Sequence, residues 1–447
     1  MRVFLSILFS ILLGVNSAFS YQLVLPKEKK SLTTHEYALF VGKVENNEDF
    51  SINNEKIYIA PNGAFAHSVK LKNGENRIML KSNFNSHFYK IYKENQVSKE
   101  DSKLIEFKKK LFEVKRNNTP LRSTPIDAGM NRLSHLFKGT KLLINGEKGD
   151  FYRVYLSKDE EAWISKNSIN ICNESIDPEF ITMENTNYKN ASKYSIEFTE
   201  KLPYVIKETN DEIIFKVYNS MISDGSVYTI NAPKPDKYSY QTSLNDGIYT
   251  FKISALPEMQ NNLKGLTITL DAGHGGTEKG AIGCLGHQEK DINLKIINDL
   301  KKELTALGAK VILTRDSDVN VSLDERVKIA KNNYSDIFIS VHLNSIPDVK
   351  FNLSKHQGTS VYYYNPNSKD LANSIKKSIV NKLNTRDDGV KTASFAVIRP
   401  AEYIGVLVEV AYMTNPHDSV LYTKDNFASE TATAIADGIL NYIKNNK

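Results

Sequence analysis

The sequence predicts a multidomain protein in which all-β modules precede a C-terminal α/β domain. Before residue 257, short β-rich runs alternate with turn residues, a pattern typical of small β domains. From residue 265 onward, apolar strands alternate with amphipathic helices, which indicates a sheet covered by helices on both faces. At 447 residues, the chain is long enough for three or four such domains.

Hydrophobic periodicity predicts the elements of the C-terminal domain in order. Ser322 and Glu325 form a capping box for a helix that carries Leu323, Val327 and Ile329 as its apolar residues. Gly308 is expected to end the preceding helix. The expected strands are 267–270, 310–314, 336–344, 359–364, 395–399 and 404–410. The other expected helices are 291–307, one that carries Leu371, Ile375, Ile379 and Leu383, and a terminal one that carries Ile435, Ile439 and Ile443.

The candidate chemistry begins in residues 267–293. A strand-like run breaks into DAGHGG at 271–276, where glycines permit positive φ and leave room around the imidazole of His274. Glu289 stands at the start of the next expected helix. A histidine at a strand end and a carboxylate at the following helix start can converge on one point, and such a pair is half of a catalytic zinc site.

Two later strands supply the rest of the candidate site. A catalytic zinc takes three protein ligands and keeps a fourth position for water. His342 ends the buried-type strand 336–344 and is the candidate third ligand. Glu409 interrupts the apolar run 404–410, where a carboxylate is costly unless it is paired, hydrogen-bonded or working. Singly, each residue also has an ordinary interpretation, as a loop histidine or a salt-bridged core glutamate.

These motifs together resemble a known enzyme family. DAGHGG, GHQEK, SVHLN and VLVEVAYMTN follow one another in the order found in the zinc-dependent N-acetylmuramoyl-L-alanine amidases, over residues 266–447. The resemblance implies a three-layer αβα hydrolase domain with Zn²⁺ as cofactor. By motif, it implies that the zinc ligands are His274, Glu289 and His342, and that Glu409 is the catalytic glutamate. The ending VAYMTN departs from the family's usual Gly-Phe-x-Ser-Asn, and neither this change nor Cys284 touches an implied ligand.

The resemblance also implies a reaction. Zinc-activated water would cleave the amide between N-acetylmuramic acid and the L-alanine of the peptidoglycan stem, for cell-wall remodelling, daughter-cell separation or lysis. Asn344 and Arg399 lie beside the motifs in sequence and are candidate stem-peptide contacts. Two alternatives stay open: a wall-binding protein with a retired amidase domain, and a zinc peptidase that cuts within the stem. The complete ligand set argues against the first, whereas the second differs only in its pocket.

The N-terminus and the composition bear on location and partners. Residues 1–20 combine Arg2, an apolar core at 3–15 and a small-x-small ending, which predicts a secretory signal peptide too short to span a membrane. We therefore expect an exported protein, periplasmic or cell-wall associated, without a transmembrane anchor. The net charge of +6 is dispersed and no nucleic-acid motif is present, so no nucleic-acid partner is expected. Two cysteines, Cys172 and Cys284, exclude a disulfide scaffold, and a single bridge between distant domains stays open as the alternative.

The upstream modules are expected either to target peptidoglycan or to act as spacers. The first resembles the immunoglobulin-like β-sandwiches of bacterial surface enzymes, and the second resembles a bacterial SH3-like domain. In the second, Trp163 and Tyr152 are candidate wall contacts, with a core position as the alternative. The expected boundaries are signal peptide 1–20, immunoglobulin-like domain 21–97, linker 98–117, SH3-like domain 118–172, a further β-rich domain 173–256, linker 257–264 and catalytic domain 265–447.

Overall fold

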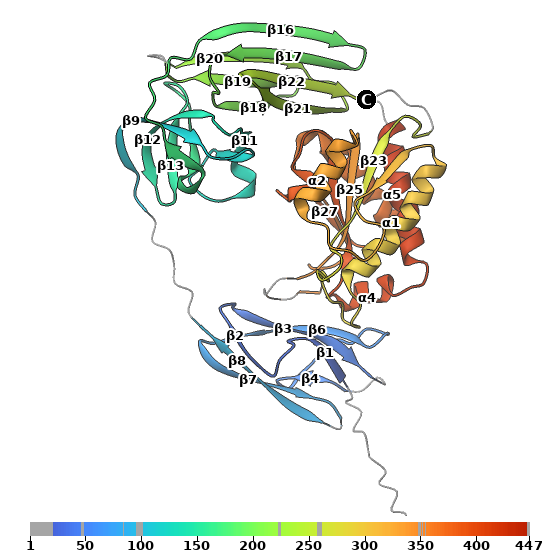
Figure 1. Cartoon of the computed structure of the whole chain (residues 1–447). Coiled ribbons are helices and arrows are strands. Elements are labelled where there is room, and N and C mark those ends of the chain that lie inside the picture. The colour runs from blue at the N-terminus through green and yellow to red at the C-terminus, as the bar shows by residue number, and fades with distance from the viewer. Residues whose placement is uncertain are drawn as a thin grey trace, which may run out of the picture.

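The computed structural model contains three β modules and one α/β domain (Figure 1). It describes residues 21–45, 49–83, 85–94, 102–221, 225–256, 262–346, 350, 352–353 and 355–444. The expected signal peptide at 1–20 lies outside these residues. Within them, no helix is long and apolar enough to cross a membrane.

The first module is built from two sheets that enclose one core. The strand orders are β1-β3-β6 and β2-β8-β7-β4-β5, and β2 runs parallel to β8. Phe40 and Phe65 from the first sheet meet Ile78 and Leu80 from the second, because alternate residues of each strand point inward. The strands are β1 (Tyr21–Leu25), β2 (Lys30–Thr33), β3 (Tyr37–Val44), β4 (Ser51–Ile52), β5 (Glu55–Lys56), β6 (Ala64–Lys70), β7 (Gly74–Lys81) and β8 (Ser86–Lys93).

The second module is one seven-stranded sheet of order β11-β10-β14-β13-β12-β9-β15. Strand β9 (Ile105–Val114) falls inside the expected linker 98–117, so that prediction is wrong for these residues. The strand escaped prediction because its lysines give an exposed first half, whereas Phe112 and Val114 are buried near its end. The other strands are β10 (Thr119–Arg122), β11 (Arg132–Leu136), β12 (Lys141–Lys148), β13 (Phe151–Tyr155), β14 (Glu161–Ser165) and β15 (Ile169–Ile171), with 3-10 turns η1 (Gly129–Asn131) and η2 (Lys166–Ser168).

The third module shares its hydrophobic core with the second. Its two sheets have the orders β16-β17-β22-β21 and β18-β19-β20. Aromatic residues such as Tyr204, Phe215 and Tyr249 continue the cluster that holds Leu121 and Ile164 of the second module. The two modules therefore form one body. The strands are β16 (Phe180–Tyr188), β17 (Ala191–Phe198), β18 (Tyr204–Glu208), β19 (Glu212–Asn219), β20 (Ser226–Pro233), β21 (Tyr238–Asn245) and β22 (Ile248–Ala255).

The C-terminal domain has a six-stranded sheet of order β24-β23-β25-β28-β26-β27. The first four strands are parallel, and β26 is antiparallel to β28. The strands are β23 (Thr267–Ala272), β24 (Lys310–Leu313), β25 (Ile337–Asn344), β26 (Thr359–Tyr363), β27 (Asp387–Thr392) and β28 (Ile404–Tyr412). The helices are α1 (Glu289–Ala306), α2 (Leu323–Asn332), α3 (Lys369–Leu383), α4 (Pro416–Tyr422) and α5 (Phe427–Lys444), with 3-10 turns η3 (Pro366–Ser368) and η4 (Ala396–Ile398).

Helices pack on both faces of this sheet. α1, α3 and α5 cover one face through a large apolar cluster, to which β25 contributes Ile337, Ile339 and Val341. α2 and η4 cover the other face around Phe338 and Leu407. Because successive side chains of a strand point to opposite faces of the sheet, the intervening residues of β25 and β28 lie on the face that α2 covers. That face carries the polar residues of the candidate site.

Two local predictions for this domain are wrong. Residues 395–399 were expected to form a strand, but they contain the 3-10 turn η4, and the edge strand lies earlier, at β27. The apolar face expected for α2 is right at Val327, which packs against the cluster around Phe338, but wrong at Leu323. Leu323 is 58 % exposed, whereas Arg326 is only 3 % exposed and points inward. A pattern built from apolar residues does not include arginine, so it cannot predict a helix face on which an arginine is buried.

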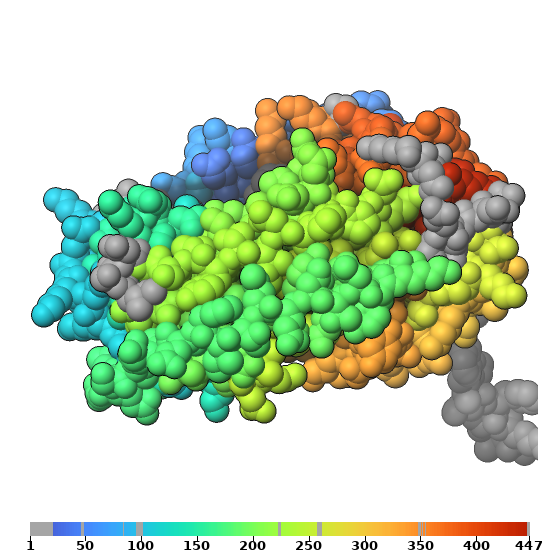
Figure 2. All heavy atoms as spheres, turned by 90° about the horizontal axis from the view of Figure 1, so that it is seen from above, coloured from blue at the N-terminus to red at the C-terminus, as the bar shows by residue number. Residues whose placement is uncertain are grey.

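Both ends of the catalytic domain contact the upstream modules. At the end that includes α4, Leu39 and Val41 of the first module pack with Cys284 and Tyr412. At the opposite end, the Tyr240 amide of the third module donates to the Ala401 carbonyl at 2.8 Å. Seen from above, the third module lies over the catalytic domain (Figure 2). The site end and the opposite end are thus held by different modules.

Gly438 provides a test of packing between α3 and α5. A Cβ at this position would lie 2.6 Å from the Ile375 Cα of α3. Helix propensity alone predicts that Gly438→Ala stabilises the helix by about 1 kcal/mol. Because the clash is with backbone, we expect the opposite sign, a loss of about 1–3 kcal/mol in thermal or denaturant unfolding.

The control is Asn441→Ala on the exposed side of the same helix. It should change the unfolding free energy by no more than about 0.5 kcal/mol. A Gly438→Ala variant as stable as the parent protein would show that α3 and α5 are not packed this closely.

Candidate active site

Three candidate ligands from three elements converge at the carboxyl end of the parallel strands. His274 follows β23, Glu289 is the first residue of α1, and His342 lies near the end of β25. Nε2 of His274 is 3.2 Å from Oε2 of Glu289, and Nδ1 of His342 is 2.8 Å from Oε1. The three donor atoms all lie within 4.8 Å of one another. The expected ligand set is therefore assembled as one cluster.

Glu289 is the centre of this cluster. Its side chain is only 4 % exposed and accepts hydrogen bonds from the amides of Ala281 at 2.8 Å and Leu343 at 3.2 Å. Burial alone would raise the pKa of Glu289, but the hydrogen bonds from both histidines outweigh it and hold that pKa well below its ordinary value. The hydrogen bond to Glu289 also raises the pKa of His274. The carboxylate therefore stays charged between two imidazoles.

Glycines make room for the cluster. A Cβ on Gly273 would lie 2.2 Å from Cε1 of His342. A Cβ on Gly280 would lie 2.5 Å from Oε2 of Glu289 and 2.6 Å from Cδ2 of His274, and Gly280 has a φ of +67°. Any side chain at either position would push a candidate ligand aside. His274 itself has a φ of 60°, which glycine-rich surroundings accommodate.

Two buried arginines hold the turn that carries His274, and sequence reasoning missed both. Arg326 donates to Asp271 Oδ1 at 2.6 Å and to the carbonyl oxygens of Ala272 and His274, each at 2.8 Å. Arg315 donates to the carbonyls of Ala272 at 2.9 Å and Gly273 at 3.0 Å. Asp271 was the residue that could have predicted a buried arginine, because a buried carboxylate at a strand end needs a cation as its partner.

Glu409 lies beside the cluster on the neighbouring strand. It is directly opposite His342 in the β25–β28 register and opposite Ser360 in the β26–β28 register. Its Oε2 is buried and has no hydrogen-bond partner among the described residues. Burial and the nearby charge of Glu289 raise the pKa of Glu409 well above its ordinary value, and Lys391 partly opposes this rise. An unpartnered carboxyl at this place suits a group that exchanges a proton with a reactant.

A polar group on β27 completes this side of the site, and no motif or periodicity predicted it. Nζ of Lys391 is 2.7 Å from Asp388 Oδ2, which also accepts a hydrogen bond from the Tyr412 hydroxyl at 2.8 Å. Tyr412 belongs to the same strand as Glu409. The group ties the edge strand to the strand that carries the candidate base.

The other residues singled out in the sequence divide into two groups. Asn344 follows His342 by two residues on β25 and therefore shares its face. Arg399, by contrast, lies before the start of β28, five residues from Ile404 and ten from Glu409. Its guanidinium donates to the hydroxyl and carbonyl oxygens of Ser394 at 2.9 and 2.8 Å. The structure therefore does not bring Arg399 to the cluster.

The cysteines play no evident part in the cluster. Cys284 is 1 % exposed, packs against the first module, and has a thiol pKa raised by burial to about 12. Such a thiol remains protonated, which argues against a nucleophile or a ligand. Cys172 is also free and lies in the second module.

The donor set fits a zinc ion. Two imidazole nitrogens and one carboxylate oxygen form one of the known three-ligand sets of catalytic zinc sites, in which the fourth position takes water or substrate. Glu289 also has hydrogen-bond donors behind it, in the amides of Ala281 and Leu343 and the side chain of Asn293. Such outer contacts orient metal ligands. His274, Glu289 and His342 would therefore hold the ion.

Comparison with known proteins agrees with this geometry. The family model described as N-acetylmuramoyl-L-alanine amidase matches residues 268–441. The amidase LytC of Bacillus subtilis is 38 % identical over 191 residues, which cover 42 % of this chain and 37 % of LytC. The germination-specific N-acetylmuramoyl-L-alanine amidase of the same organism is 30 % identical over 222 residues, which cover 46 % of this chain and 88 % of that relative. The chain belongs to the N-acetylmuramoyl-L-alanine amidase family.

Membership in the amidase family is carried by the C-terminal domain alone. Among solved structures, the amidase AmiC2 of Nostoc punctiforme is 34 % identical and covers 40 % of this chain and 98 % of its own, with a TM-score of 0.38. The match spans little more than a third of LytC, so the likeness to LytC does not extend to that whole protein. The immunoglobulin-like and SH3-like identities of the upstream modules remain predictions.

Gly273→Ala tests whether the close contact between Gly273 and the His342 ring sets the position of that candidate zinc ligand. The added methyl must displace the His342 ring, so we expect zinc affinity to fall roughly 10–100-fold, as it does when groups that orient a ligand are lost. Zinc content after dialysis and competition with a chelator measure the change.

Gly286→Ala is the matched control, because it lies in the same loop region and has nothing within 4 Å of its Cβ position. Because Gly286 has a φ of +84°, we expect Gly286→Ala to lose some stability, but its zinc affinity should match that of the parent. Equal zinc affinity in both variants would contradict the steric role of Gly273.

Proposed function

We propose that the protein is a zinc-dependent N-acetylmuramoyl-L-alanine amidase that cleaves the bond between N-acetylmuramic acid and the L-alanine of the peptidoglycan stem. The observation that carries the proposal is the His274–Glu289–His342 cluster with Glu409 directly opposite His342 in the sheet. Membership in the amidase family supports the choice of substrate. The four residues keep the roles that the sequence resemblance implied.

The residues of the chain divide the work of hydrolysis. His274, Glu289 and His342 would hold the zinc ion, which when bound supplies Lewis acidity that lowers the pKa of a water molecule and polarises a carbonyl. Glu409 would accept the proton of the attacking water and then deliver it to the departing L-alanine nitrogen. A buried carboxyl oxygen without a fixed hydrogen-bond partner among the described residues suits both transfers, because it is free to bind and release a proton. Water adds across one amide bond, so one carboxylate and one amine leave the site.

Asn344 is the candidate contact for the stem peptide, because it lies on the same face of β25 as His342 and both side chains are partly exposed at the end of that strand. We do not extend this role to Arg399, which lies at the other end of β28. Zinc chemistry is common to amidases and peptidases, and only the pocket sets the bond that is cut.

We further propose that the protein acts outside the cytoplasm on the cell wall, in remodelling, daughter-cell separation or lysis. The predicted signal peptide at 1–20 supports export. The upstream modules would bring the catalytic domain to peptidoglycan, and each of them contacts the catalytic domain or the body joined to it.

Glu409→Gln and His274→Ala separate proton transfer from metal binding. Glu409→Gln keeps the shape of the side chain but removes the base, so zinc content should stay at one per chain while turnover falls about 10²–10⁴-fold. His274→Ala removes a ligand, so both zinc content and turnover should be lost. The assay is digestion of purified peptidoglycan by the full chain, with mass spectrometry of the soluble products.

The products identify the reaction. Free stem peptides with new L-alanine amino termini, lost with a chelator and restored by zinc, are expected. Shortened stems would instead establish a peptidase, and bound but uncut glycopeptides would establish a binding protein. Near-normal turnover in Glu409→Gln would remove Glu409 from the proposed role.

A further inference from the structure

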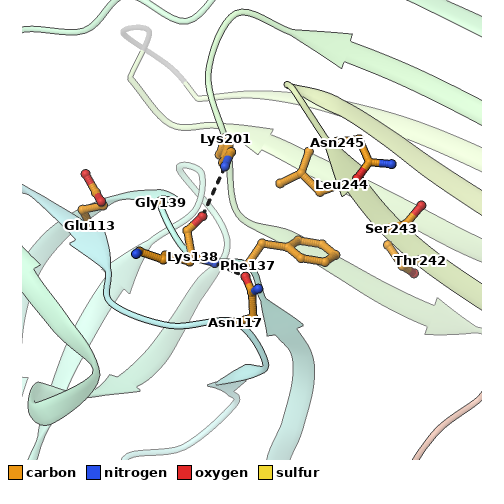
Figure 3. Close-up of a pocket in the computed structure, with 10 residues that line it drawn as sticks. All are labelled: Glu113, Asn117, Phe137, Lys138, Gly139, Lys201, Thr242, Ser243, Leu244 and Asn245. Carbon is orange, nitrogen blue, oxygen red and sulfur yellow. Dashed lines mark hydrogen bonds between the residues drawn. The ribbon is translucent and has the colours of Figure 1, made fainter. Parts of the chain in front are cut away.

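A pocket of about 650 Å³ lies between the second and third modules, remote in the chain from the zinc cluster (Figure 3). This volume falls in the range of small-ligand sites, about 300–1,000 Å³. Two segments of the second module and two of the third form its walls. The lining residues are Glu113, Asn117, Phe137, Lys138, Gly139, Lys201, Thr242, Ser243, Leu244 and Asn245.

The walls of this pocket are fixed relative to each other. The Lys141 amide donates to the Lys201 carbonyl at 2.7 Å, and the Tyr204 hydroxyl donates to the His135 carbonyl at 2.7 Å. The shared apolar core lies directly behind these contacts. The pocket is therefore part of one folded body and needs no domain movement to form.

The apolar part of the pocket consists of the Phe137 ring and Leu244. The Phe137 ring stacks on Tyr204 with centroids 5.8 Å apart and an interplanar angle of 27°. It remains partly exposed and points between the modules toward Thr242 and Leu244 (Figure 3). A flat apolar surface of this kind suits the C–H face of a sugar ring better than a compact aliphatic side chain.

The polar part suits hydroxyl and acetamido groups. Thr242 offers a hydroxyl that both donates and accepts, on the same face of β21 as Leu244. Asn117 uses its oxygen to accept from the Lys138 amide at 2.7 Å, which leaves its NH₂ group for a ligand. One hydroxyl, of Thr242, and one amide, of Asn117, beside an aromatic ring suit an N-acetylated sugar.

The charged part is positive. Glu113 pairs with Lys141, whose Nζ lies 2.7 Å from Glu113 and 3.2 Å from Glu174, so the pocket has one carboxylate against the two lysines that line it. Lys138 and Lys201 have no carboxylate partner among the residues that the structure describes, and Lys201 Nζ reaches only the Lys138 carbonyl at 3.5 Å. Two uncompensated ammonium groups at one site favour an anionic ligand.

We propose that this pocket binds peptide-free glycan strands of peptidoglycan, with an N-acetylated sugar on Phe137 and a lactyl carboxylate near Lys138 and Lys201. The inference rests on the proposed function, because each amide hydrolysed leaves one free lactyl carboxylate on the glycan. The pocket therefore binds the product strand, and the enzyme stays on glycan that it has already stripped.

The test is calorimetric titration of the full chain with three soluble probes that it does not cleave. They are a peptide-free GlcNAc–MurNAc tetrasaccharide, a neutral N-acetylglucosamine tetrasaccharide and a free stem tetrapeptide. We expect the peptide-free glycan to bind at least about fivefold more tightly than the neutral one and to weaken with added salt. The stem peptide should show no measurable binding.

Charge reversal locates the site. Lys138→Glu with Lys201→Glu should weaken binding of the peptide-free glycan about tenfold or more and leave the neutral tetrasaccharide within about twofold. Lys158→Glu with Lys189→Glu makes the same charge change at exposed positions outside the pocket, one in each module, and should change neither affinity. Both pairs should unfold at the temperature of the parent.

Three results would overturn the proposal. They are equal affinity for charged and neutral glycans, binding of the stem peptide alone, and an equal loss in the control pair. The titration uses glycan prepared beforehand, so it is independent of turnover. A protein that binds the glycan but cuts no peptidoglycan would refute the amidase function alone, and an active protein that fails to bind it would refute the pocket alone.

Discussion

The buried carboxylate of Glu289 is the interaction on which the catalytic end of the molecule depends. It is charged in a place that excludes water, and it is stable there only because two imidazoles and several backbone and side-chain donors surround it. Three elements must therefore meet at one point: the turn after β23, the start of α1 and the end of β25. The arginines behind the His274 turn serve the same end, because they fix carbonyl oxygens that would otherwise be free to move.

Motif order predicted the four central residues, and the parallel sheet explains why. Carboxyl ends of neighbouring parallel strands share one edge, so His274, His342 and Glu409 had to converge once their strands were identified. Arg399 shows the limit of this reasoning. Arg399 is only ten residues from Glu409 in sequence. Strand β28 runs between the two residues, however, so they lie near opposite ends of that strand. Arg326 shows another limit, since hydrophobic periodicity cannot identify a helix that buries a cation against backbone oxygens.

The upstream half was predicted in kind but not in detail. Turn residues and β-rich runs indicated sheets, and sheets are present throughout. The lysine-rich stretch before Val114 was assigned to a linker because its composition is polar, yet backbone pairing with β12 and β15 makes it a strand. The fusion of the second and third cores was invisible in the sequence, because shared burial depends on contacts between segments far apart in the chain.

Gly273 and Gly280 have a consequence for how such proteins are compared. Neither glycine has a side chain that can bind a ligand or form a hydrogen bond. The space that a Cβ would fill is instead occupied by the ring or carboxylate of a candidate zinc ligand. Across related sequences, these positions should tolerate as little variation as the histidines themselves. A method that ranks residues by invariance would class both glycines as reactive groups. What selection preserves at these two positions, however, is the lack of a side chain.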